Sequence, residues 1–329
     1  MESKIGESQV KPVRIPEEKV YDGDIQFPLV LEADKVPSRE DLGAWIKAHH
    51  EHLDDLLIKH GAILFRGFGV DDAPALSHFA DAFPYEEFEY VGGNAVRTLL
   101  APRVFTTNEA PPSEPIPFHH ELAQAPVYPG HLYFSCQLPA KSGGETSLVG
   151  SWVVLEELRA KHPGFVAAVE EKGLRYIRVL SEEDDPSSAI GRGWKSTYWT
   201  DSKEEVERKL AEKGYNWEWL KDGCLKTISP VLSGVRQDPR TKRKVYFNQM
   251  IAAYTGWKDS RNDPEKAIVL GDFTPVDPVA MKDTVEIMKK YQVNFPWQKG
   301  DVVLVDNILT MHARMPFEAP RKILASLAK

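Results

Sequence analysis

The sequence has few of the features that several large classes of protein require. Only two of its 329 residues are cysteine, Cys136 and Cys224, so neither a disulfide framework nor a zinc site built from cysteine thiolates is expected. No apolar run approaches the roughly 20 residues that a membrane-spanning helix needs, and we expect no membrane partner. The N-terminal residues are polar and carry no apolar signal-peptide core. These observations predict a cytoplasmic protein in a reducing compartment.

Basic residues are too few for a nucleic-acid-binding protein. Lys and Arg number 41 against 49 Asp and Glu, which gives a formal net charge of -8. Because binding to phosphates requires a basic face, we expect no nucleic acid partner. Hydrophobic residues make up 42% of the chain and charged residues 27%, as in a globular protein with a large core.

Short strand patterns alternate with helical ones along the chain, without an internal repeat or a shift in composition. Residues 1–35 are mixed in charge and show no clear period, and we interpret them as an N-terminal arm. Residues 36–329 are predicted to form one domain. Helices are predicted at 38–61, 73–83, 152–160, 164–172, 203–213 and 277–291, and strands at 62–67, 131–136, 174–180, 225–228, 244–248, 301–305, 308–313 and 322–327. This distribution favours an α+β fold with a double-stranded β-helix (jelly roll) core, flanking helices and insertions.

A histidine and a glutamate two residues apart, His119 and Glu121, point to the same side of any extended strand. Such a pair can supply two of the three protein ligands of a 2-His-1-carboxylate iron site. His312, just beyond the apolar run 301–307, is the best-placed third ligand. His120 is the rival of His119, but strand alternation points its imidazole away from Glu121. Among ten histidines a His-x-Glu triplet alone is a weak signal, although three protein ligands would leave metal positions open for reactants.

Further motifs strengthen this interpretation. They are Phe118-His119-His120-Glu121, Gly143-Gly144-Glu145-Thr146, Ile190 to Ser196, Ala253 to Trp257, Asp306-Asn307 ahead of His312, and Arg321-Lys322. Together these motifs resemble the taurine dioxygenase/clavaminate synthase-like family of Fe(II)- and 2-oxoglutarate-dependent oxygenases. The resemblance extends from about residue 50 to residue 329 and is closest to clavaminate synthase-like proteins of unassigned substrate.

The resemblance implies that His119, Glu121 and His312 bind Fe(II), although many members carry aspartate where this chain has Glu121. It also implies that Thr146 binds the distal carboxylate of the co-substrate 2-oxoglutarate. A basic residue on the last strand would pair with the same carboxylate. The family's arginine falls on Lys322, and a shift of one residue would place Arg321 there; both remain candidates, because strand alternation lets only one of them face the pocket.

The reaction implied by the resemblance is oxidation of a small molecule with O₂, which releases succinate and CO₂. Hydroxylation is the default outcome, and desaturation or cyclisation would use the same residues. In the taurine enzyme a further arginine binds the sulfonate, and Ser326 stands at that position here, which argues against taurine as the substrate. Arg97, Arg192 and Asn248 lie in polar stretches that could contact substrate, although a structural role is the default for each.

Two other functions use the same residues. One is a zinc-dependent hydrolase with His119, Glu121 and His312 as ligands, but the sequence offers no recognisable hydrolytic base. The other is a jelly-roll binding protein without turnover. The sequence predicts neither the identity of the substrate nor the oligomeric state.

Overall fold

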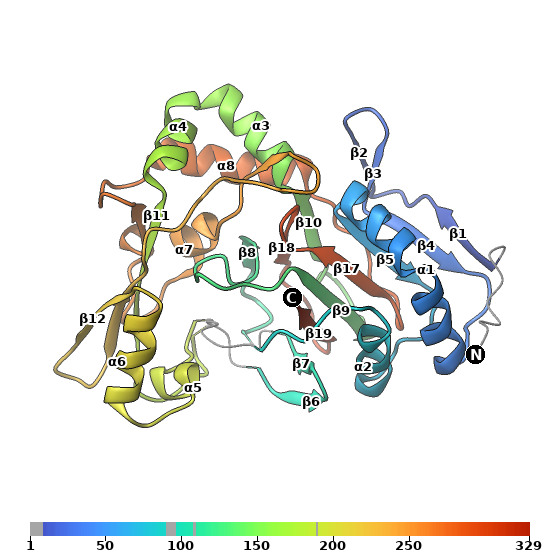
Figure 1. Cartoon of the computed structure of the whole chain (residues 1–329), viewed down its shortest axis with the longest axis horizontal. Coiled ribbons are helices and arrows are strands. Elements are labelled where there is room, and N and C mark those ends of the chain that lie inside the picture. The colour runs from blue at the N-terminus through green and yellow to red at the C-terminus, as the bar shows by residue number, and fades with distance from the viewer. Residues whose placement is uncertain (1–8, 90–96, 108–109, 189) are drawn as a thin grey trace.

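Two β-sheets built from strands distant in the sequence form the centre of the fold, as a computed structural model of the chain shows (Figure 1). The structure describes residues 9–89, 97–107, 110–188 and 190–329. The larger sheet runs in the order β1 (Val10–Val13), β4 (Leu29–Ala33), β5 (Ala62–Arg66), β17 (Val302–Asp306), β9 (His131–Leu138), β19 (Lys322–Ala328), β7 (Val104–Thr106) and β6 (Leu99–Ala101). The smaller sheet runs in the order β10 (Thr146–Gly150), β18 (Thr310–Arg314) and β8 (Ile116–His119). Within these two sheets, only β4 and β5 are parallel neighbours.

Side chains on both faces of the central strands β5, β17, β9 and β19 of the larger sheet are mostly buried, whereas the edge strands β1 and β6 are partly exposed. In β9, Leu132 and Phe134 join the core between the two sheets, whereas Tyr133 packs on the opposite side. That side is covered by the helices α1 (Arg39–His60) and α2 (Ala73–Asp81). Because both faces are covered, the strands read as nearly continuous apolar runs in the sequence.

Helix α1 has the boundaries that its sequence predicts. The Ser38 hydroxyl accepts a hydrogen bond from the backbone N–H of Asp41 at 3.1 Å, which caps the first turn. At the other end, Gly61 adopts φ of 73°, a left-handed conformation that glycine tolerates best.

A second layer packs against the smaller sheet and extends to the left in Figure 1. Its sheet runs in the order β12 (Asn216–Trp219), β13 (Leu225–Ile228), β11 (Leu174–Leu180) and β16 (Ile268–Leu270). The helices are α3 (Ser151–Lys161), α4 (Pro163–Lys172), α5 (Trp194–Tyr198), α6 (Lys203–Glu212), α7 (Met250–Gly256) and α8 (Pro278–Tyr291), with a 3-10 turn at Pro264–Lys266. The remaining strands are β2 (Lys19–Tyr21), β3 (Ile25–Phe27), β14 (Arg236–Gln237) and β15 (Lys244–Val245).

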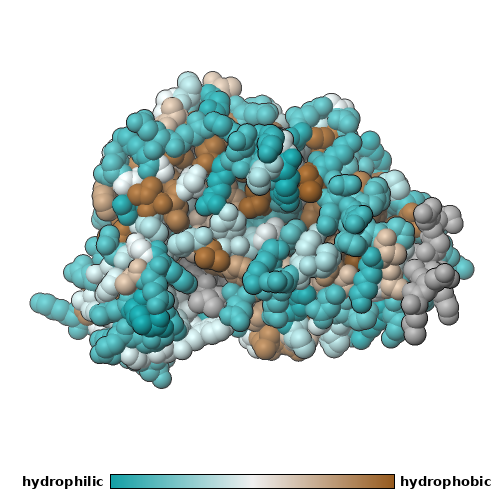
Figure 2. Space-filling view, viewed as in Figure 1, coloured by the Kyte–Doolittle hydropathy of each residue, from teal (hydrophilic) through white to brown (hydrophobic). Residues whose placement is uncertain are grey.

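The predicted α+β fold with a jelly-roll core is confirmed. Within the N-terminal segment, β1 and β4 hydrogen-bond into the larger sheet. The division into an arm at 1–35 and a domain at 36–329 stays a prediction. No helix in the described part of the chain is long and apolar enough to cross a membrane. The face in Figure 2 is mostly hydrophilic, with apolar residues scattered in small groups.

Candidate active site

The smaller sheet brings together two histidines from distant parts of the chain. His119 is the last residue of β8 and lies directly opposite His312 of β18 in the antiparallel register. Their ring centroids are 4.2 Å apart, with the ring planes inclined at 48°. From the larger sheet, the ring of Phe134 packs against His312 at 5.1 Å between centroids. Strand pairing therefore fixes the two imidazoles as neighbours.

Glu121 reaches the two histidines from outside the strand. β8 ends at His119, and residues 121–124 form a turn in which Leu122 has φ of 58°. The Oε2 atom of Glu121 lies 3.7 Å from Nε2 of His312. One potential ligand atom from each of the three residues lies within 4.8 Å of the others. The structure thus brings the three residues together, but the strand alternation that we expected to orient Glu121 is absent.

Both histidines present neutral imidazoles to this site. Burial lowers the pKa of His119 and lowers that of His312 well below its ordinary value. The Nδ1 atom of His119 lies 2.8 Å from the carbonyl oxygen of Pro117, which can only accept. Nδ1 therefore carries the proton, and Nε2 keeps a lone pair for a metal. Two neutral imidazoles and one carboxylate form the donor set of non-heme Fe(II) oxygenases, so the residues fit this ion.

Arg97 contacts the same carboxylate. Its Nη2 atom donates to Oε2 of Glu121 at 3.0 Å, and the two side chains are 8% and 6% exposed. Arg97 also lines the cavity in front of the three residues. Arg192 and Asn248 are not among the described residues that line this cavity, and each donates to a backbone carbonyl instead.

His120 faces the opposite direction from His119. It is fully buried, its Nδ1 donates to the carbonyl oxygen of Asn307, and its Nε2 lies 2.7 Å from the Ser151 hydroxyl. Burial lowers the pKa of His120 to about 3. Since both ring nitrogens are engaged away from Glu121, the geometry favours His119 as the ligand.

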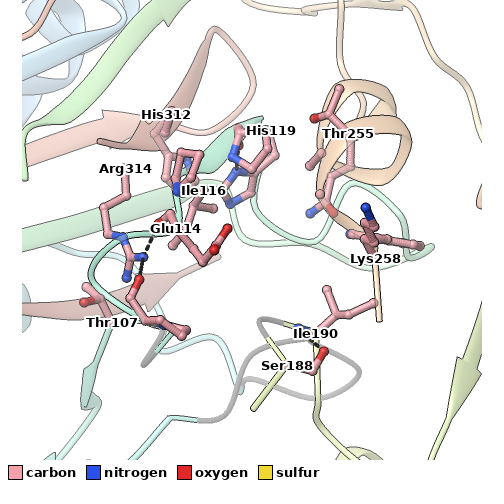
Figure 3. A pocket seen from close by; sticks show the side chains of 18 of the residues that line it. Thr107, Glu114, Ile116, His119, Ser188, Ile190, Thr255, Lys258, His312 and Arg314 are labelled. Atoms are coloured by element: carbon pink, nitrogen blue, oxygen red, sulfur yellow. Dashed lines mark hydrogen bonds between the residues drawn. The ribbon is translucent and has the colours of Figure 1, made fainter. Parts of the chain in front are cut away.

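A cavity of about 850 Å³ opens in front of the histidines (Figure 3). Thr146 and Arg321 lie in its wall, and Lys322 is exposed and is not among the described lining residues. Thr146 is buried, and its hydroxyl accepts from the Trp297 indole N–H at 3.2 Å. Burial, with the charge of Arg314, lowers the pKa of Arg321 to about 10, so its guanidinium stays protonated at neutral pH. The two residues offer a hydroxyl and a cation to an acidic ligand.

Sequence reasoning missed Arg314, which lies two residues after His312 on β18 and also lines the cavity. Its guanidinium donates to the carbonyl oxygens of Ala110, Pro111 and Glu114 at 2.6 to 3.1 Å. Strand alternation places residues i and i+2 on one face, so the spacing from His312 could have identified Arg314.

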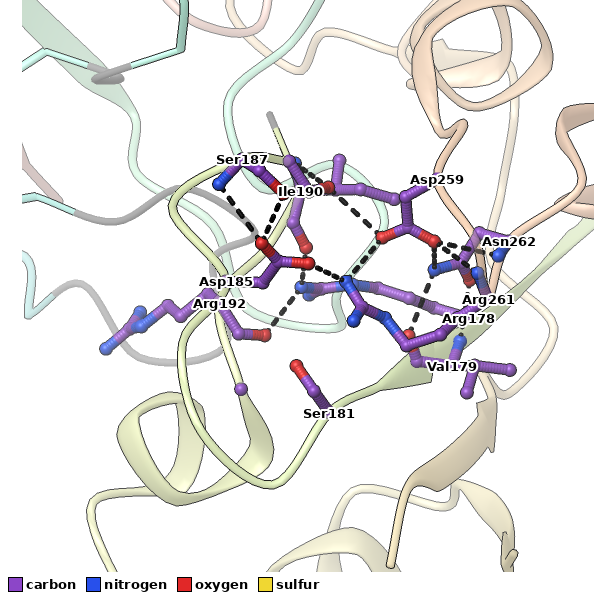
Figure 4. Close-up of polar contacts among 12 residues, drawn as sticks. Arg178, Val179, Ser181, Asp185, Ser187, Ile190, Arg192, Asp259, Arg261 and Asn262 are labelled. Atoms are coloured by element: carbon purple, nitrogen blue, oxygen red, sulfur yellow. Dashed lines mark hydrogen bonds and ion pairs between the residues drawn. The ribbon is translucent and has the colours of Figure 1, made fainter. Parts of the chain in front are cut away.

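The cavity wall opposite the histidines comes from two loops that the sequence did not place there. Asp185, Ser187 and Ser188 line it from one loop, and residues 255–260 line it from the end of α7 and the loop that follows this helix. Arg261 joins the loops, because its Nη2 donates to Asp185 at 2.7 Å and to Asp259 at 2.9 Å (Figure 4). The quoted motifs at 190–196 and 253–257 both contribute lining residues.

Comparisons with known proteins identify the family of the chain. Residues 28–327 match the family described as "Taurine catabolism dioxygenase TauD, TfdA family". Over 321 residues the chain is 46% identical to a clavaminate synthase-like protein of Arabidopsis thaliana, covering 96% of this chain and 97% of the relative. Over 289 residues it is 31% identical to the dapdiamide synthesis protein DdaC of Enterobacter agglomerans, covering 84% and 85%.

Solved structures with the same fold share little sequence. PvcB from Pseudomonas aeruginosa superposes with a TM-score of 0.54 at 14% identity, covering 100% of this chain and 94% of that one. AAD-2, solved in complex with Mn(II) and N-oxalylglycine, superposes with a TM-score of 0.54 at 13% identity, covering 97% and 96%. At these identities the similarity supports the fold alone.

Proposed function

Because the chain belongs to the TauD/TfdA family of Fe(II)- and 2-oxoglutarate-dependent oxygenases, we propose that it oxidises a small molecule, with hydroxylation as the default reaction. Succinate and CO₂ would be the products of the co-substrate. The convergence of His119, Glu121 and His312 at the wall of one large cavity carries this proposal. The family assignment favours the oxygenase over a zinc hydrolase or a binding protein without turnover.

The three residues would hold Fe(II), which in this family activates O₂ with electrons from 2-oxoglutarate. The neutral imidazoles and the single carboxylate leave the ion a net positive charge, which favours the binding of an anionic oxo acid. Three protein ligands also leave coordination positions for the co-substrate and O₂. The cavity would hold the substrate beside the bound ion, and the ion would supply the oxidative chemistry.

Thr146 and Arg321 would receive the distal carboxylate of 2-oxoglutarate. Arg321 is favoured over Lys322 because it lines the cavity, whereas Lys322 is exposed. A guanidinium binds a carboxylate with two parallel hydrogen bonds, which fixes the orientation of the oxo acid. Taurine is not favoured as the substrate, because the position four residues after Arg321 is Ala325 and the one four residues after Lys322 is Ser326, and neither side chain offers a cation for a sulfonate.

Anaerobic titration of the protein with Fe(II) and 2-oxoglutarate tests the proposal. An oxygenase should develop a weak visible charge-transfer band, and in air it should release succinate slowly even without substrate. His312→Ala should abolish both signals, whereas the control His52→Ala, an exposed histidine on α1, should retain them. A wild-type protein that develops no band and releases no succinate would refute the proposed function. A metabolite panel scored by succinate release would then identify the substrate.

A further inference from the structure

The orientation of Glu121 has to come from a source other than the strand, because β8 ends at His119. Asn307 supplies it. Its Oδ1 accepts from the N–H of Glu121 at 2.8 Å, and its Nδ2 donates to the carbonyl oxygen of Glu121 at 3.0 Å. The two bonds satisfy both backbone polar groups of Glu121, as a neighbouring strand does in a hydrogen-bonded pair.

Asn307 also links Glu121 to the strand that carries His312. It lies in the turn between β17 and β18 and is fully buried. Its Nδ2 donates to the carbonyl oxygen of Pro129 at 2.7 Å, and its backbone N–H donates to that of Gly130 at 2.9 Å. One side chain therefore fixes the turn before His312, the turn that contains Glu121 and the segment before β9.

His120, which lies between the two ligands of the first motif, strengthens this link. Its ring donates to the backbone carbonyl of Asn307, and its other ring nitrogen contacts the Ser151 hydroxyl. The carbonyl oxygen of His120 accepts from Nε2 of Gln249 at 2.9 Å. The residue between His119 and Glu121 is thus held on the far side of the chain, which leaves both ligands directed at His312.

From these contacts we propose that Asn307 is a positioning residue for the metal centre, which holds the Glu121 carboxylate in place relative to His119 and His312. The proposal rests on the proposed function. A carboxamide accepts from the N–H and donates to the C=O of one residue at the same time; an ionised carboxylate loses the donor and an alkyl group loses both. Residues that orient metal ligands through hydrogen bonds typically contribute about 10- to 100-fold to metal affinity.

The test is Mn(II) binding to the full-length, metal-stripped protein, measured by electron paramagnetic resonance. Asn307→Asp keeps the volume and removes the donor, and its added negative charge favours cation binding. A loss of affinity in this variant therefore reports a change in geometry. Asn262→Asp is the matched control, because Asn262 accepts from Val179 N–H at 2.8 Å and donates to Val179 C=O at 3.0 Å.

Asn307→Asp should bind Mn(II) at least tenfold more weakly than wild type, whereas Asn262→Asp should stay within threefold. If Asn307→Asp does not fold, Asn307→Ala should show the same loss. An Asn307 variant that binds within threefold of wild type, or an equal loss in both asparagine variants, would overturn the positioning role. Failure of the wild-type protein to bind Mn(II) would instead count against the metal site itself.

Discussion

Replacement of Arg321 should weaken 2-oxoglutarate binding, and Lys322 provides the control. Arg321 lines the cavity, its Nε donates to the carbonyl oxygen of Gly144 at 2.7 Å, and its guanidinium lies 5.3 Å from the centroid of the Phe317 ring. These contacts hold the charged group in one orientation before any ligand arrives. Arg321→Ala removes the charge, and Arg321→Lys keeps the charge but loses the planar fork.

The expected loss follows from the strength of a charged hydrogen bond. Such a bond contributes about 1.5–3 kcal/mol. A loss of about 2–3 kcal/mol in Arg321→Ala corresponds to a dissociation constant roughly 30- to 150-fold higher. Arg321→Lys should bind 2-oxoglutarate about tenfold more weakly, because lysine can keep only one of the two parallel hydrogen bonds to the carboxylate. Lys322→Ala should stay within threefold, since that side chain is exposed.

The assay is anaerobic titration of 2-oxoglutarate into the Fe(II)-loaded protein, followed by the charge-transfer band. Calorimetry with Mn(II) in place of Fe(II) gives an independent dissociation constant. Thermal unfolding of each variant controls for damage to the Gly144 turn. The assignment is wrong if Arg321→Ala binds within threefold of wild type, or if Lys322→Ala loses more affinity than Arg321→Ala.

Three further predictions concern the site and its walls. In the metal-free protein, Glu121→Ala should lower the free energy of unfolding in urea by about 3 kcal/mol, because the buried Arg97 loses its carboxylate partner; a loss below 1 kcal/mol would mean that this pair adds little. Gly143→Ala should lower the free energy of unfolding by about 2 kcal/mol or more, since Gly143 has φ of 67° and a Cβ there would lie 2.2 Å from the backbone oxygen of Pro316. The control Gly164→Ala, in open space on a helix, should instead stabilise by up to about 1 kcal/mol, and equal effects would contradict this account. Arg261→Met should speed amide hydrogen exchange at 255–260 about tenfold and leave Mn(II) affinity unchanged, so unaltered exchange would show that Arg261 does not hold the cavity wall.

Local patterns in the sequence predicted much of the fold. β11 and β13 have the predicted boundaries, because each is a short run of alternating burial between turn residues. Helix α7 was missed, since its seven residues are too few to show a helical period. The position of such a short helix depends on its packing against other elements, which a local sequence pattern does not show.

For the site, the residue types could be predicted but not what orients them. Asn307 belongs to a distant turn, so no local pattern connects it with Glu121. The choice between Arg321 and Lys322 depended on which face of β19 borders the cavity. Ile323 faces the core between the sheets, but Arg321 precedes β19, and the pairing of β19 with β9 is irregular between Lys322 and Ile323. Strand alternation alone therefore could not decide between Arg321 and Lys322.

β8 is the outermost strand of its sheet, and its pairing with β18 is irregular between His312 and Arg314. A metal ion bound by both histidines would stabilise the pairing of β8 with β18 beyond what the backbone hydrogen bonds between these strands provide. The metal-free protein should therefore open at β8 first, and a protease should cleave it there more readily than the metal-bound protein.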